Sequence, residues 1–198
     1  IGMLDIQTRD ELDVPGTNFG VARIRGDILP GLTMGTLFTN RDDGDDYNRA
    51  VGVDMAVRFW SGSTLDAWTT NVWSSEGDGR SSAGAVDLTI DTDLYLFELG
   101  YLNVGDDFNP GVGFVRRRDM IRYSGKAGVS PRIGRGDRFV RQVSLSAGGE
   151  YIEGQNHEKQ STELRADFSF SLENTDRGGG GVRRNFERLD VPFQIRDD

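Results

Sequence analysis

Apolar and polar residues alternate with a period of two along most of the chain. In residues 50–60, AVGVDMAVRFW, the apolar positions are Val51, Val53, Met55, Val57 and Phe59. Residues 163–173, ELRADFSFSLE, and residues 187–196 repeat the pattern. Strict alternation is typical of a β-strand with two unlike faces, and a helical period fits none of these windows. The pattern predicts an all-β protein.

Glycine, proline and polar clusters divide the chain into about twelve candidate strands. We place them at residues 2–8, 17–28, 32–40, 50–60, 64–74, 82–90, 93–103, 113–123, 126–134, 138–152, 158–173 and 183–196. Short turns, such as Pro30-Gly31 and Ser124-Gly125, alternate with longer polar loops, such as 104–112 and 174–182. Regular alternation favours an antiparallel up-and-down meander over a Greek-key sandwich.

Strand length points towards a membrane. Several candidate strands have about ten residues or more, whereas strands of soluble sheets average ~5–6 residues, and a tilted strand needs ~9–11 residues to cross a bilayer. Five aromatic residues lie near strand ends: Trp60, Trp73, Tyr101, Tyr123 and Tyr151. Membrane barrels carry aromatic girdles at both interfaces. We therefore expect an outer-membrane β-barrel, or part of one. Alternation alone leaves open whether the apolar face points outward to lipid or inward to a core.

Composition limits the classes of partner. The 198 residues suffice for a single domain, residues 1–198, and the missing initiator Met leads us to expect a fragment of a longer chain. There is no cysteine, which excludes disulfides and thiolate metal sites. The formal charge of −9 argues against nucleic acid as a partner. The run Gly178–Gly181 lacks the Lys-Ser/Thr of a phosphate-binding loop, and we expect no cofactor.

Charged residues on the polar faces of the predicted strands are candidates to line a lumen. They are Asp54, Arg58, Arg116, Arg118, Arg122, Arg165 and Asp167. Three of them, Arg116, Arg118 and Arg122, share one face of the predicted strand 113–123. An arginine ladder on an inner wall would attract anions. Ion pairs with lumen acids such as Asp54 or Glu98 are the alternative.

One acidic loop is a candidate cation site. Its carboxylates, Asp42, Asp43, Asp45 and Asp46, surround Gly44, and hard cations prefer oxygen ligands. The loop lacks the spacing and the closing glutamate of an EF-hand, so a solvated acidic hairpin tip is the favoured interpretation. His157 is the only histidine, which excludes histidine-dependent triads and multi-histidine metal sites.

Four stretches resemble one bacterial envelope family. The run YLNVGDDFNPGVGFVRRRD, residues 101–119, is similar to its G-D-F-x-P-x-x-G-F-x-x-R segment. Residues 17–25 resemble its N-x-x-V-x-R-x-R strand. Residues 35–41 and 48–54 resemble its G-x-x-x-T-N-R and N-R-x-x-G-x-D strands. Members pair an N-terminal family-9-type carbohydrate-binding module with a C-terminal barrel-like domain of unknown function. The matches run from about residue 2 to residue 134, with a weaker fit beyond.

The resemblance implies an outer-membrane barrel that works with a sugar-binding module absent from this chain. It brings no catalytic residues. The expected function is passage or surface binding of a ligand, with a glycan as one ligand class and the lipid bilayer of the bacterial outer membrane as partner.

Two other functions stay open. The first is a soluble β-rich carbohydrate-binding domain, in which Trp60, Trp68 and Trp73 form a stacking surface. The second is an envelope hydrolase, which would need two converging carboxylates in a pocket.

Overall fold

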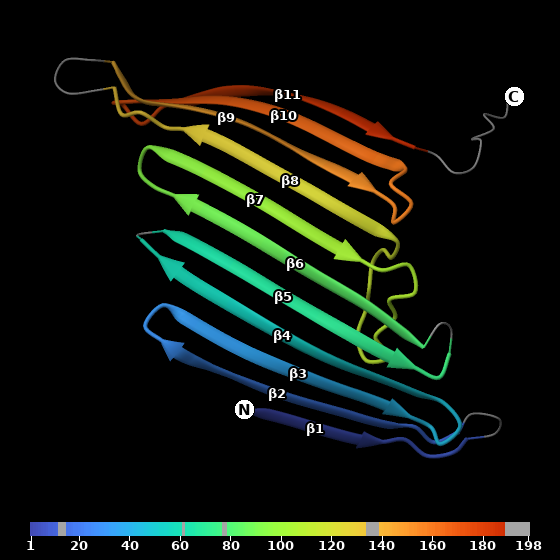
Figure 1. The fold of residues 1–198 in the computed structure, drawn as a ribbon. Coiled ribbons are helices and arrows are strands. Elements are labelled where there is room, and N and C mark those ends of the chain that lie inside the picture. The colour runs from blue at the N-terminus through green and yellow to red at the C-terminus, as the bar shows by residue number, and fades with distance from the viewer. Residues whose placement is uncertain (12–14, 61, 77–78, 134–138, 189–198) are drawn as a thin grey trace, which may run out of the picture.

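The computed structural model describes residues 1–11, 15–60, 62–76, 79–133 and 139–188. These residues form eleven strands and no helix (Figure 1). The strands are β1 (Gly2–Gln7), β2 (Asn18–Leu29), β3 (Leu32–Asp42), β4 (Tyr47–Phe59), β5 (Ser63–Ser74), β6 (Arg80–Asp91), β7 (Tyr95–Val104), β8 (Met120–Val129), β9 (Val140–Glu153), β10 (Lys159–Leu172) and β11 (Arg177–Glu187).

Each strand pairs with its neighbour in the sequence, which confirms the all-β antiparallel up-and-down meander. The order of the single sheet is β1 to β11 without a crossover, and Figure 1 shows the strands stacked in that order. Among the described residues, β1 and β11 have one neighbour each, so the sheet is open. Because the strand count is odd, β1 and β11 run in the same direction. Closure of one on the other would therefore require a parallel pair.

The cross-strand register defines two faces, because directly paired residues point to the same side of a sheet. On β4, Val53 pairs with Thr36 on β3 and with Thr69 on β5, whereas Asp54 pairs with Gly35 and Trp68. We call the side that carries Val53 the apolar face and the side that carries Asp54 the polar face.

The apolar face is the more exposed of the two. Val51 and Val53 are 40% and 50% exposed, while Asn48, Ala50 and Gly52 on the polar face of the same strand are buried. Exposed apolar-face residues occur on strands across the sheet: Ile24, Met34, Phe38, Val86, Leu99, Leu145, Leu164 and Val182. In the described residues, the apolar side chains of this face are therefore not packed into a core.

The connections lie at two ends of the sheet. One end, which we call the turn end, carries the tight turns after β2, β4 and β6; the other, the loop end, carries the long segment 105–119 between β7 and β8. Gly31 shows why the tight turns need glycine. Its φ is +81°, and a Cβ there would lie 2.6 Å from the carbonyl oxygen of Arg58.

The predicted turn at Ser124-Gly125 is wrong. Gly125 lies inside β8, where it pairs with Leu99 and Gly149. The predicted strand 113–123 is mostly loop, since β8 begins at Met120. One strand replaces two, so the regular alternation of short and long connections ends after β8. β8 ends and β9 begins at the turn end, and the five-residue connection 154–158 lies at the loop end.

The glycine run Gly178–Gly181 also differs from its prediction as a loop, because it lies in β11. Gly178 and Gly180 pair with Phe170 and Phe168, and a Cβ at Gly178 would lie 2.6 Å from the ring of Phe170. Gly178 leaves room for the ring of Phe170, whereas a Cβ at Gly180 would meet nothing within 4 Å. The predicted connection 135–137 and residues 189–196 of the last predicted strand lie outside the described residues.

Candidate functional site: the two faces of the sheet

Ion pairs extend across the polar face. Arg23 on β2 lies 2.5 Å from Asp54 on β4, with Gly35 of β3 between them. A Cβ at Gly35 would lie 2.8 Å from the Asp54 carboxylate, so the glycine gives the pair its space. Arg25 also lies 3.9 Å from Asp54, and further polar-face pairs are Lys126–Glu98 (4.0 Å), Arg122–Glu150 (3.9 Å), Arg183–Glu163 (3.3 Å) and Arg165–Asp167 (3.1 Å). The pairs balance charge on a half-exposed surface, where each contributes little to stability.

Five of the predicted lumen residues lie on this polar face: Asp54, Arg58, Arg122, Arg165 and Asp167. Arg116 and Arg118 do not share it as predicted, because both precede β8 and lie in the segment 105–119. The predicted arginine ladder is therefore absent: Arg122 is the only one of its three members in a strand.

A hollow of about 370 Å³ lies on the polar face over β6 to β10. Its charged lining residues are Asp87, Glu98, Lys126, Glu150, Glu163 and Arg165. Glu150 and Glu163 face each other in register, yet each lies within 4.0 Å of an arginine. The carboxylates are therefore parts of ion pairs, and the hollow is a mixed-charge surface suited to polar solutes. The geometry gives no acid and base roles to this pair.

The segment 105–119 folds back over the polar face at the loop end (Figure 1). The Asn48 side chain of β4 holds it at two points. Its Nδ2 donates to the carbonyl oxygen of Asn109 (2.8 Å), and the Gly111 N–H donates to its Oδ1 (2.7 Å). A Cβ at Gly111 would lie 2.8 Å from the Cβ of Asn48, so only glycine fits this approach.

Phe108 anchors the same segment in an apolar cluster. It is 6% exposed and packs with Ala50, Val72, Ala83, Val104, Met120 and Ile152, with Leu102 and Val115 at the margin. The strand members of this cluster lie on the polar face of β4 to β9. It is the one buried apolar cluster among the described residues. At the far end of the segment, the Asp119 carboxylate accepts from the Gln155 N–H (2.8 Å).

The arginines of this segment have separate surroundings. Arg117 donates to the side-chain oxygen of Gln160 (2.5 Å). Arg118 lines a hollow of about 160 Å³ with Asp107 and Asn109 of the segment and Glu76 beyond β5. Of the three consecutive arginines, Arg117 therefore bonds the segment to β10.

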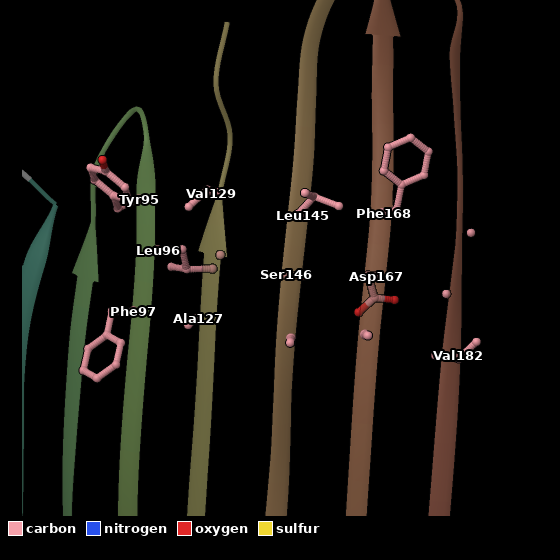
Figure 2. A pocket seen from close by; sticks show the side chains of 15 residues that line it. Tyr95, Leu96, Phe97, Ala127, Val129, Leu145, Ser146, Asp167, Phe168 and Val182 are labelled. Atoms are coloured by element: carbon pink, nitrogen blue, oxygen red, sulfur yellow. The ribbon is translucent and has the colours of Figure 1, made fainter.

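The apolar face carries a shallow groove of about 860 Å³ across β7 to β11 (Figure 2). Figure 2 shows Phe97 and Phe168 at opposite sides of it, with Ala127 between them. Ala127, Ala147 and Ala166 pair in register, and their small side chains form the floor of the groove at its middle. The groove is lined almost entirely by apolar atoms, as is a surface that contacts hydrocarbon.

Aromatic residues of the apolar face gather towards both strand ends. Towards the loop end these are Tyr47, Trp73, Tyr101, Tyr123, Tyr151 and Phe186, and towards the turn end Phe59, Tyr95, Phe97, Phe168 and Phe170. The rings of Tyr101, Tyr123 and Tyr151 follow one another at 5.5 and 6.3 Å. The residues between the two groups are mainly aliphatic or small.

The three tryptophans do not form one stacking surface. Trp73 lies on the apolar face, Trp68 lies on the polar face opposite Asp54, and Trp60 lies in the exposed turn after β4. The predicted surface fails because Trp68 and Trp73 are an odd number of residues apart on one strand, and such residues point to opposite faces.

The predicted cation loop, with Asp42, Asp43, Asp45 and Asp46, is held by its own hydrogen bonds. Asp43 accepts from the Asp46 N–H (2.8 Å) and lies 3.6 Å from Arg41, and Asp42 lies 3.2 Å from Arg49. In the part of the chain that the structure describes, no three acidic or histidine side chains are grouped to hold a metal ion. The arrangement matches the acidic hairpin tip and gives no support to a metal site.

Comparisons with protein-family models, with curated proteins and with solved structures found no match. Within the described ranges, no helix is long and apolar enough to cross a membrane.

Sequence reasoning missed Asn48 and Phe108. Asn48 lies within the predicted loop 41–49, and Phe108 lies in a turn cluster of Gly, Asp, Asn and Pro. One signal was present: a large apolar side chain in an otherwise polar turn has to be buried or leave an exposed apolar surface.

Proposed function

We propose that the chain is a segment of an outer-membrane β-barrel that passes or binds a polar ligand and is not catalytic. The apolar face contacts lipid, and the polar face lines an aqueous lumen. The bacterial outer membrane is the proposed location.

The observation that carries this proposal is the exposure of the apolar face. Its side chains extend over strands of 10 to 14 residues, from β2 to β11, and are not covered by any other described part of the chain. Soluble monomers rarely expose apolar patches of more than a few hundred Å². Aromatic groups towards both strand ends, with an aliphatic zone between them, support the same conclusion because membrane barrels have this distribution.

The polar face has the properties expected of a water-filled lumen. Its ion pairs are half-exposed, and the hollow beside Glu98 and Lys126 offers both signs of charge. Such a surface suits uncharged polar or zwitterionic solutes better than one ionic sign. A glycan is the ligand class to test first, since the resemblance of residues 101–119 associates this domain with a sugar-binding module.

Two tryptophans on opposite faces of β5, Trp68 and Trp73, allow a direct test. The chain is reconstituted into vesicles that contain brominated phosphatidylcholine, in single-tryptophan variants with the other two tryptophans replaced by Phe. Bromine quenches indole fluorescence only at short range. We expect brominated lipid to quench Trp73 and to leave Trp68 bright, whereas acrylamide from the aqueous phase reaches Trp68.

Two outcomes would contradict the proposal. A chain that stays in the aqueous fraction, with neither tryptophan quenched by lipid, is a soluble domain and favours the carbohydrate-binding alternative. Equal quenching of Trp68 and Trp73 would mean that the two faces do not separate lipid from water. The variant that keeps only Trp60 serves as the control for the turn end.

A further inference from the structure

We infer that the segment 105–119 is an internal constriction of the proposed lumen and sets the size of the solutes that pass. The inference rests on the proposed function. It assigns to this segment a role that its loop chemistry alone does not indicate, because a loop of this length could equally extend away from the sheet.

The first observation is the direction of the segment. It leaves β7 and reaches back to β4, where Asn48 bonds to Asn109 and Gly111. Asn48 belongs to the polar face, so the segment crosses the polar side of β5 and β6 on its way. In a barrel, a chain that crosses the inner side of its own strands narrows the lumen.

The second observation is how firmly the segment is held. Phe108 is buried, and the side chain of Asn48 is 6% exposed with both its polar atoms bonded to the segment. At the base, the Gly105 N–H donates to the Ser82 carbonyl oxygen (3.0 Å), and the Asp119 N–H donates to the Gly105 carbonyl oxygen (3.2 Å). Removing one buried partner leaves the other unsatisfied, which is unfavourable. The segment is therefore a fixed obstruction and not a mobile lid.

The third observation is the contrast with another connection at the same end. The acidic loop Asp43–Asp46 is closed by its own hydrogen bonds and by Ser75, and its residues are absent from the apolar cluster. Of these two connections at the loop end, only 105–119 combines a buried aromatic anchor with a side-chain clamp from another strand. Asn48 is the positioning residue of this arrangement.

The test measures the swelling of vesicles that contain the full chain, in solutions of a monosaccharide, a disaccharide and a trisaccharide. One variant replaces residues 106–118 with a short Gly-Ser linker. We expect the trisaccharide to enter severalfold faster through this variant than through the wild type, with a smaller gain for the monosaccharide. Phe114→Ala, at an exposed residue of the same segment, is the control and should match the wild type.

A second variant keeps the result interpretable if the shortened chain misfolds. Asn48→Ala with Phe108→Ala removes the clamp and the buried anchor of the segment without shortening the chain. In vesicles we expect this double variant to admit the trisaccharide faster than the wild type, by a smaller factor than the shortened variant does.

The outcomes separate the two proposals. A chain that does not float with the vesicles overturns the barrel, and the constriction with it. A shortened variant that floats with unchanged swelling rates overturns the constriction alone, as does, where the shortened chain misfolds, an Asn48→Ala/Phe108→Ala variant that floats with unchanged rates. Faster trisaccharide entry through the variant that folds supports both.

Discussion

Val53 and Asp54 are adjacent in β4 and have opposite surroundings. Val53 is half exposed on a face where no described residue covers it, whereas Asp54 lies beside Arg23 among half-buried polar groups. In a soluble sheet the apolar neighbour would be the buried one. In the described residues the apolar face is thus the more exposed of the two, with one departure: the apolar cluster around Phe108 lies on the polar face.

The largest effect on the free energy of unfolding is expected in the apolar cluster around Phe108. Phe108→Ala removes a buried ring from the cluster, and we expect a loss of about 3–5 kcal/mol in the free energy of unfolding. Urea unfolding of the reconstituted chain, followed by tryptophan fluorescence, measures it. The control is Phe114→Ala, since Phe114 is 88% exposed and should leave the midpoint unchanged. Equal effects of the two substitutions would mean that the segment is not anchored.

A charge placed on the apolar face should have a different effect from a charge placed on the polar face. Val53→Arg introduces a charge near the middle of the apolar face, and we expect a loss of about 2–4 kcal/mol for a chain in a bilayer. The matched change on the polar face is Asp66→Arg, which places a positive charge opposite Asp87 and should be neutral or favourable.

The same unfolding assay in vesicles compares these two charge variants. If the apolar face meets water, Val53→Arg will be tolerated as well as Asp66→Arg, and the lipid contact is refuted.

Asn48→Ala should have an intermediate effect. It leaves the Gly111 N–H and the Asn109 carbonyl without their partner, and a buried unsatisfied group costs about 1–3 kcal/mol. Asn174→Ala is the control, because Asn174 bonds to Asp176 in an exposed turn. A double-mutant cycle with Phe108→Ala should show coupling, since both residues hold one segment. Strict additivity would argue that they act independently.

The smallest effect is expected at the ion pairs. Asp54→Asn removes the charge that faces Arg23, and we expect a loss of less than about 1 kcal/mol because the pair is half-exposed. The difference from the wild type should shrink further as salt rises, which a series of unfolding curves at increasing ionic strength would show. A loss of unfolding free energy as large as that of Phe108→Ala would mean that water does not reach the polar face.

Period-two alternation was enough to predict most of the strands and their faces, though not β8, where one strand replaces two predicted ones. Neighbouring side chains of a strand point to opposite sides for local steric reasons, so Val51, Val53 and Asp54 could be placed on their faces without any tertiary contact. The meander was predicted from the alternation of short and long connections between these strands. Strand ends were less certain, as β3 and β4 extend beyond their predicted bounds.

Not every glycine could be placed from the sequence. The turn at Gly31 was predicted from Pro30-Gly31, whereas Gly125 lies within β8 and Gly178 lies opposite the ring of Phe170. A glycine is compatible with all three settings, and at Gly125 and Gly178 only the cross-strand neighbour decides which one it occupies.

Long-range contacts likewise set the direction of the segment 105–119. Its turn residues indicated a bend and left its direction open. Asn48 and Phe108 set that direction by bonds and packing between residues about 60 positions apart, and such contacts leave no periodic trace in the sequence. The chain's local chemistry thus determined the strands and their two faces, while the choice of which polar and apolar groups meet across the sheet belonged to the tertiary structure.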